Sequence, residues 1–275
     1  MKTHQRMSLV LAACLIMTGR AAASSLSASG AELELHGLTF RDAALLAERV
    51  YEPERASLPT TLAPVVCVDD SVSGLFAEIF ELRDGRGHLG GCHLVVVIRG
   101  VEFSRLKTDF AAFSADAKAA AAGGLPQWRI LEQPLLDAVQ ARRASRVTIV
   151  GHSMGGMIAQ LAAAHLVRSS LALNVTAVMF NCPGVSAIVN SELPDFSRQT
   201  PGNLDLIHIV HQADPIPRVT MFGGHMECTR WYLVREPSET PHSIQAFLTY
   251  LESHGGGLPE RLSAEQVSLL LSFRP

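Results

Sequence analysis

Charged and aromatic residues are scarce in this chain of 275 residues. Asp, Glu, Lys and Arg together make up 18% of the sequence and the aromatic residues 6%, whereas hydrophobic residues make up 48%. The formal net charge is only −3, so the sequence lacks the clustered basic surface that a nucleic-acid partner requires. These shortages exclude a nucleic-acid-binding role, and the apolar content is sufficient for one sizeable core.

The sequence also lacks internal repeats, long linkers and any CxxC pair or other spacing typical of metal ligands. We therefore expect neither a metal nor another cofactor. The apolar segment near the N-terminus, Met7–Thr18, is too short to span a bilayer. We expect no transmembrane helix in the mature chain.

The N-terminus shows a basic segment, an apolar stretch and then small residues. "MKTHQR" precedes Met7–Thr18, and "AAA" at 21–23 offers a cleavage site. This order is typical of a secretory signal peptide, so we predict that residues 1–23 are removed and that the protein is secreted or periplasmic. An uncleaved interfacial helix or a disordered leader is the alternative. "LAAC", ending at Cys14, also resembles a bacterial lipobox, although a lipoprotein is the weaker interpretation.

Cleavage at that site leaves an even number of cysteines. An even number in an exported protein permits disulfides, but buried free thiols fit the sequence equally well. Four cysteines allow three pairings, so the sequence leaves the connectivity open. The four are Cys67, Cys92, Cys182 and Cys228.

Strand-like and helix-like segments alternate along residues 24–275. Apolar runs bounded by turn residues predict buried strands, and spacings of three and four predict helices between them. This alternation predicts a single α/β domain with a mostly parallel sheet and helices on both faces. The expected strands are 74–82, 92–100, 146–151, 174–184 and 203–217, and the expected helices are 38–52, 125–144 and the segment that follows Ser153.

A serine stands between a buried strand and a helix in "VTIVGHSMGGMIAQLAA". Strand, G-x-S-x-G and helix together are the context of a nucleophile elbow, which exposes the serine hydroxyl above the sheet. Glycines on both sides leave room for the sharp turn. We predict that Ser153 is a nucleophile and that the Met154 amide stabilises an oxyanion. The alternative is a tight strand–helix turn without chemistry.

A nucleophilic serine needs a histidine base and a carboxylate that orients it, and in this fold class they follow in the order Ser, acid, His. Asp214 follows a predicted strand at its carboxyl end, whereas Asp195 lies in a loop and Asp205 lies within the strand. A turn-forming role before Pro215 is the alternative for Asp214.

Three histidines follow Asp214 in the sequence. His242 stands at the start of an amphipathic helix pattern, His225 precedes a strand-like run and His254 lies where that helix ends. We predict His242 as the base, with His225 and His254 as alternatives.

At these residues the sequence resembles the class 3 (fungal-type) lipase family, a branch of the α/β-hydrolase fold. The similar segments are "SGLFAEIFEL", "VVVIRGVEFSRLKTDF", "VTIVGHSMGGMIAQLAA", "HIVHQADPIPRV" and the stretch from His242 to Tyr250. The resemblance implies an α/β-hydrolase fold, a triad of Ser153, Asp214 and His242, and an oxyanion site that includes the backbone N–H groups of Val101 and Met154.

Two features of the segment after "RG" bear on that oxyanion site. The family usually has Thr or Ser where this chain has Val101, so a hydroxyl donor is missing and the oxyanion relies on backbone donors. Residues 102–124 correspond to the part that often carries a lid in the family. Their apolar spacing fits a movable flap or an ordinary core-facing helix.

These observations favour a serine carboxylester hydrolase that acts on an acyl lipid ester, at a lipid–water interface, through an acyl-enzyme. A triacylglycerol lipase, a phospholipase A1 and a small-ester esterase differ in pocket and lid, and the sequence does not separate them. The alternatives are an acyltransferase, in which an alcohol replaces water, and a non-catalytic lipid-binding protein on the same scaffold.

Overall fold

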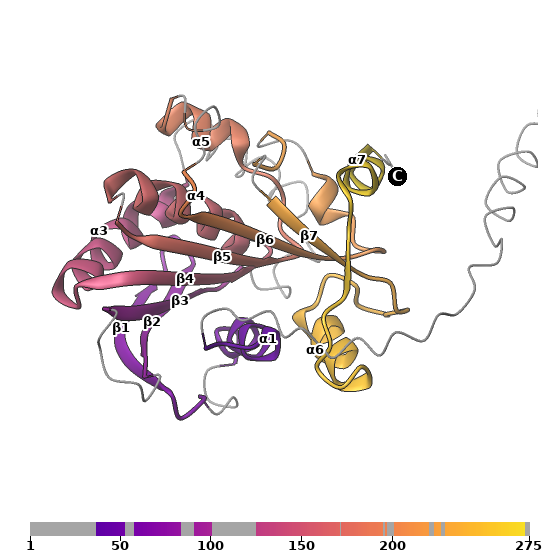
Figure 1. The fold of residues 1–275 in the computed structure, drawn as a ribbon, viewed down its shortest axis with the longest axis horizontal. Coiled ribbons are helices and arrows are strands. Elements are labelled where there is room, and N and C mark those ends of the chain that lie inside the picture. Colours follow the sequence, from indigo (N-terminus) through magenta and orange to yellow (C-terminus); the bar gives the residue numbers. More distant parts are fainter. Residues whose placement is uncertain are drawn as a thin grey trace, which may run out of the picture. The chain divides into compact units, whose positions relative to one another are not determined.

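A mostly parallel sheet forms the centre of the molecule (Figure 1). The structure, a computed structural model, describes residues 37–52, 58–83, 91–100, 125–170, 172–194, 196, 201–219, 223–226 and 229–272. Within these residues the sheet has eight strands, which lie side by side in the order of the sequence. Strands β3 to β7 run parallel to one another, whereas β1, β2 and β8 add antiparallel edges.

The strand bounds are β1 Leu62–Asp70, β2 Leu75–Leu82, β3 Cys92–Ile98, β4 Ala144–His152, β5 Asn174–Phe180, β6 Leu204–His211, β7 Thr229–Val234 and β8 Glu260–Arg261. All seven residues of β3 are buried, because helices cover the sheet on both faces. Because strands β3 to β6 run parallel, their carboxyl ends lie at one edge of the sheet, and the loops that follow them meet there.

Helices cover the two faces of the sheet (Figure 1). One face packs against α3 (Pro126–Ala141), α4 (Met154–Ser169) and α5 (Ser186–Glu192), and the other against α1 (Phe40–Arg49) and α6 (Ile244–Ser253). Helix α4 lies close to the sheet because small residues such as Ala162 and Ala163 form much of its fully buried surface. This architecture is the α/β-hydrolase fold expected from the sequence.

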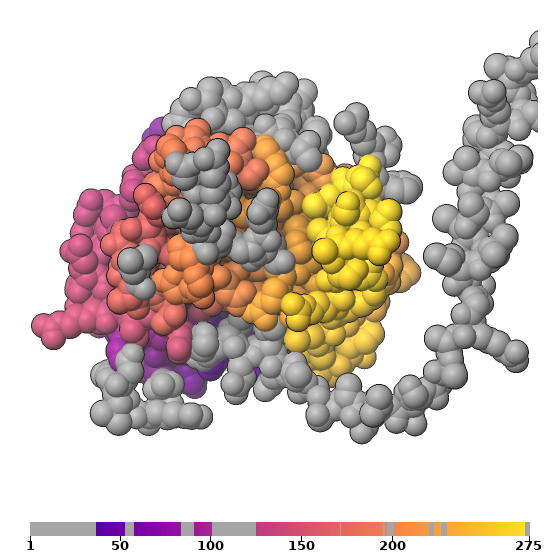
Figure 2. Space-filling view, turned by 45° about the horizontal axis from the view of Figure 1, so that its top comes forward, coloured from indigo at the N-terminus to yellow at the C-terminus, as the bar shows by residue number. Residues whose placement is uncertain are grey.

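The last helix, α7 (Ala264–Ser272), packs on the edge of the sheet rather than on its core. Val267, Leu270 and Leu271 contact a small cluster around Trp231 and Leu233 of β7. Figure 2 shows this C-terminal part in yellow at the surface, beside the orange segments of the preceding strands. No residue of α7 is buried.

The sequence predicted the strands from β2 to β6 and the helices α1, α3 and α4, but it did not single out β1, β8, α5 or α7. Strand β1 carries Pro64 and two aspartates in its nine residues, which weakens its strand signal. Pro134 lies inside α3 without ending the helix. Within the described residues Cys67, Cys92 and Cys182 are free thiols, and Cys228 lies outside them.

Candidate active site

Ser153 occupies a strained corner between β4 and α4. Its backbone has φ 56° and ψ −124°, in the positive-φ region that residues other than glycine rarely adopt. Such a conformation costs about 1–3 kcal/mol and persists only where neighbouring structure enforces it. The Ser153 amide donates to the Phe180 carbonyl at 2.9 Å, which ties the corner to the end of β5.

Glycines on both sides of Ser153 allow this corner to form. A Cβ at Gly151 would collide with the carbonyl oxygen of Gly155, and a Cβ at Gly155 would collide with the carbonyl oxygen of Ile98. The strand, the helix and the neighbouring strand β3 therefore approach more closely than any side chain permits. Sterics explain the glycines of the motif without reference to a substrate.

His242 lies between Ser153 and Asp214 and bonds both. Its Nε2 is 2.9 Å from the Ser153 Oγ, and its Nδ1 is 2.6 Å from the Asp214 Oδ2. Three separate elements supply these residues: the β4–α4 corner, the loop after β6 and the loop before α6. The structure thus brings together the three residues that the sequence predicted as a triad.

Burial and a second hydrogen bond hold the Asp214 carboxylate. The side chain is fully buried, and its Oδ1 accepts from the Ile216 amide at 3.0 Å. Since a carboxylate only accepts, the proton in the 2.6 Å bond lies on Nδ1 of His242. The Nε2 of the neutral ring is then an acceptor for the Ser153 hydroxyl, as a general base requires.

The alternative acids and bases lie elsewhere. Asp205 pairs with Arg230 across β6 and β7, and Asp195 lies outside the described residues. His225 donates from Nε2 to the Pro217 carbonyl at 2.8 Å, and burial lowers its pKa to about 4. His254 caps the end of α6, as the sequence indicated.

Of the two predicted oxyanion donors, the structure describes one. Met154 is the first residue of α4, so its amide has no carbonyl within the helix to bond and lies beside Ser153 at the positive end of the helix dipole. Val101 and the segment 102–124, a flap or a core-facing helix by its sequence, lie outside the described residues, which resume with Leu125 after Gly100.

Residues 104–223 match the family model described as Lipase (class 3). Over this segment the chain is similar to the class 3 lipase family. The matched segment contains Ser153 and Asp214 and ends before His242. This similarity supports lipase-type ester hydrolysis.

Solved structures of lipases are similar to this chain. The Lip2 lipase from Yarrowia lipolytica aligns with a TM-score of 0.52 at 15% identity, over 85% of this chain and 88% of that one. A triacylglycerol lipase from Penicillium expansum aligns with a TM-score of 0.48 at 14% identity, over 70% and 77%. At such identities the Yarrowia likeness shows the fold alone. No curated protein matches the sequence.

Three polar residues beside the triad were not identified as functional from the sequence: Tyr51, His152 and Asn181. His152 is part of "GHSMGG", and Asn181 follows β5 at the edge of the sheet where Asp214 follows β6. The signal for Asn181 was its place after a buried strand. Tyr51, just after α1, had no signal, because its contact with His152 joins positions 101 residues apart.

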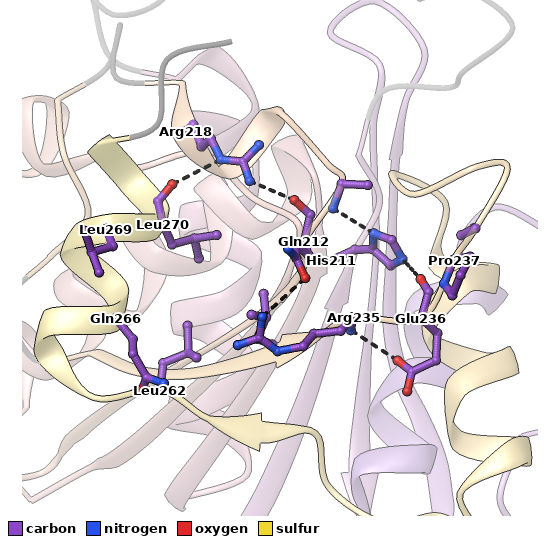
Figure 3. Close-up of a pocket in the computed structure, with 13 residues that line it drawn as sticks. His211, Gln212, Arg218, Arg235, Glu236, Pro237, Leu262, Gln266, Leu269 and Leu270 are labelled. Atoms are coloured by element: carbon purple, nitrogen blue, oxygen red, sulfur yellow. Dashed lines mark hydrogen bonds between the residues drawn. The ribbon is translucent and has the colours of Figure 1, made fainter. Parts of the chain in front are cut away.

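The loop that follows β6 and carries Asp214 is called the acid loop here. A cavity of about 840 Å³ opens beside this loop (Figure 3). The residues just before Asp214 line it, together with Arg218, Arg235 and leucines of α7 and its neighbourhood. Arg218 donates to the carbonyls of Asp214, Gln212 and Leu270, so it links the acid loop to α7. None of the three triad residues lines this cavity.

Metal binding and membrane spanning find no support in the part of the chain that the structure describes. No group of three or more His, Cys, Asp or Glu side chains there is arranged to hold a metal ion. Within the same residues, every helix is too short or too polar to cross a bilayer.

Proposed function

We propose that this chain is a serine carboxylester hydrolase acting on acyl lipid esters, with Ser153, His242 and Asp214 as its catalytic triad. The observation that carries the proposal is the unbroken pair of hydrogen bonds from the Asp214 carboxylate through His242 to the hydroxyl of a serine on a strained elbow. The similarity of residues 104–223 to the class 3 lipase family supports the reaction type.

In this mechanism the Ser153 oxygen attacks the ester carbonyl while His242 Nε2 takes the hydroxyl proton. Asp214 stabilises the imidazolium, and the amides of Met154 and Val101 bind the oxyanion. His242 then returns the proton to the departing alcohol, which leaves an acyl group on Ser153. A water molecule, deprotonated by the same histidine, hydrolyses the acyl-enzyme and restores the serine. No cofactor takes part in these steps.

The proposed substrates are esters of the triacylglycerol or phospholipase A1 type, presented at a lipid–water interface. A panel of esters of increasing chain length, measured with and without detergent micelles, tests the proposal. We expect turnover to increase with chain length and with micelles, whereas a preference for short soluble esters would indicate an esterase.

Replacement of the nucleophile tests the reaction itself. Ser153→Ala should reduce ester turnover by about 10³-fold or more, because the triad acts as a unit. The same change should abolish covalent labelling by a fluorophosphonate. Ser169→Ala is the matched control, since its hydroxyl donates to a carbonyl at the far end of α4. Near-normal activity in Ser153→Ala would contradict the proposal.

Two further measurements separate the remaining alternatives. Wild-type labelling without any ester product would point away from a hydrolase, and ester exchange with an added alcohol in preference to water would identify an acyltransferase. We also propose that the protein acts outside the cytoplasm. N-terminal sequencing of the exported protein should begin near Ser24, and a retained residue 1 would contradict this.

A further inference from the structure

Buried side chains hold two consecutive backbone carbonyls in the loop that carries His242. The Asn181 side-chain amide donates to the Pro241 carbonyl at 2.7 Å. The His152 Nε2 lies 2.6 Å from the carbonyl of His242 itself. The main chain is therefore held at the base residue and at the residue before it.

Asn181 joins this loop to the strand that leads to the acid. Its side-chain oxygen accepts from the backbone amide of His211, at the end of β6, at 2.8 Å. Its backbone amide donates to the carbonyl of Ile209. The residue is completely buried and has φ 45°, a conformation that asparagine tolerates better than most residues. One side chain thus sets the spacing between the chain before Asp214 and the chain before His242.

His152 joins the same loop to the elbow and to the chain before Val101. Since the His242 carbonyl only accepts, His152 carries its proton on Nε2. Burial, with a smaller contribution from the nearby His242, lowers the His152 pKa to about 3, so the ring is neutral and its Nδ1 accepts. The Tyr51 hydroxyl donates to this Nδ1 at 2.8 Å and accepts from the Gly100 amide at 3.0 Å.

We propose that Asn181 and His152, with Tyr51 behind His152, are positioning residues that hold His242 between Asp214 and Ser153. None of the three bonds a triad side chain in these contacts, so each acts through the backbone that carries His242 or through its neighbour. This inference rests on the proposed ester hydrolysis, because it assigns a role in placing that reaction's base.

The physical reason is the narrow tolerance of proton transfer. His242 must stay within hydrogen-bonding distance of two partners on different loops, and a displacement of about 1 Å in such an arrangement costs about 10²-fold in rate. His242 comes before α6, outside regular secondary structure. Side-chain donors that hold its backbone supply the order that a helix or strand would otherwise give.

Asn181→Gly removes the side chain while allowing the positive φ. We expect kcat to fall by about 10- to 100-fold and KM to change by less than about threefold, because the Ser153–His242 alignment is lost while substrate binding is kept. Asn203→Gly is the matched control, since this asparagine also donates to a loop carbonyl, that of Leu173, before the start of β6. It should leave kcat within about threefold.

Tyr51→Phe keeps the ring and removes one hydroxyl, so it tests the other arm in a variant that is expected to fold. We expect a drop in kcat of about 3- to 10-fold with little change in KM. Tyr250→Phe, which removes a hydroxyl bonded to the Leu258 carbonyl, is the control. Should Asn181→Gly not fold, a normal kcat in Tyr51→Phe would overturn the proposal.

A spectroscopic measurement decides the inference independently of activity. In wild type, nuclear magnetic resonance should show a far-downfield proton on His242 Nδ1 and His152 as a neutral Nε2–H tautomer above about pH 5. The His242 signal should weaken or disappear in folded Asn181→Gly and persist in Asn203→Gly. Persistence of the His242 signal in both variants, or titration of His152 near neutral pH, would overturn the proposed positioning role. Absence of ester turnover and of labelling in wild type would instead contradict the proposed function.

Discussion

Two groups of histidines contact the acid loop, one through His242 and the other through His225, and they are organised differently. In the group at the active site, both ring nitrogens of His152 and both of His242 have partners. In the other group, His208 stacks on Trp231 with ring centroids 4.4 Å apart, and His225 meets both rings edge-on. Among the described residues, His208 Nε2 and His225 Nδ1 have no hydrogen-bond partner.

The difference shows that burial alone does not make a histidine part of the proposed chemistry. Burial lowers the pKa of His208 well below its ordinary value, with a smaller contribution from His225. The Nδ1 of His208 faces the Cys182 thiol at 3.5 Å, but burial raises the pKa of that thiol, so Cys182 stays protonated and is not an activated nucleophile. The histidines around Trp231 contact one another and that residue of β7 mainly through their rings. At the candidate site, hydrogen bonds fix the orientation of each ring and the nitrogen that carries its proton.

The largest effect on activity is expected when the ring of His242, in the group at the candidate site, is removed. His242→Ala should lower kcat by about 10³-fold or more, comparable to Ser153→Ala, because serine and base act as a unit. His254→Ala, at the end of α6, should stay within about tenfold. Steady-state kinetics on both variants check this, and the opposite outcome would move the base to His254.

A smaller effect is expected at the loop that both groups contact. This loop carries Asp214, bonded by His242, and Pro217, bonded by His225. Arg218→Lys removes the planar fork that ties the loop to the Leu270 carbonyl. We expect kcat to fall by about 3- to 10-fold, because the acid shifts with its loop.

Arg235→Lys is the control for Arg218, since Arg235 lines the same cavity (Figure 3) but bonds the side chains of Glu260 and Gln212. An exposed pair of this kind contributes little. Equal kcat values for the two variants would show that the link from Arg218 to α7 does not position the acid.

The smallest effect concerns stability against pH and isolates the group around Trp231. A histidine with a lowered folded pKa stays neutral in the native state, while the unfolded chain takes up a proton below about pH 6.5. The free energy of unfolding therefore has its full value above that pH and falls as the pH drops. His208→Asn removes one such proton, so its melting temperature should decrease less than that of wild type between pH 7.5 and pH 5.

Thermal unfolding at the two pH values measures this effect, and kcat at pH 7.5 should stay within about threefold of wild type. An unchanged pH dependence of melting would mean that His208 does not contribute to acid sensitivity. A large loss of kcat would instead connect the group around Trp231 to the active site.

The sequence by itself determined the fold class and the identities of the three residues that meet in the site. Apolar runs such as the one in β3 predict buried strands because a strand covered on both faces has no polar side, and G-x-S-x-G predicts a sharp corner because few residues fit one. The order of Asp214 and His242 after Ser153 then narrowed the choice of acid and base.

Only the tertiary structure decided which distant groups hold these residues in place. The bonds from Asn181 to Pro241 and from Tyr51 to His152 join positions 60 and 101 residues apart. Sequence patterns report periodicity and local conformation, because those arise from neighbouring residues. A hydrogen bond between two loops arises only when the sheet brings the ends of its parallel strands to one edge, so no local pattern encodes it.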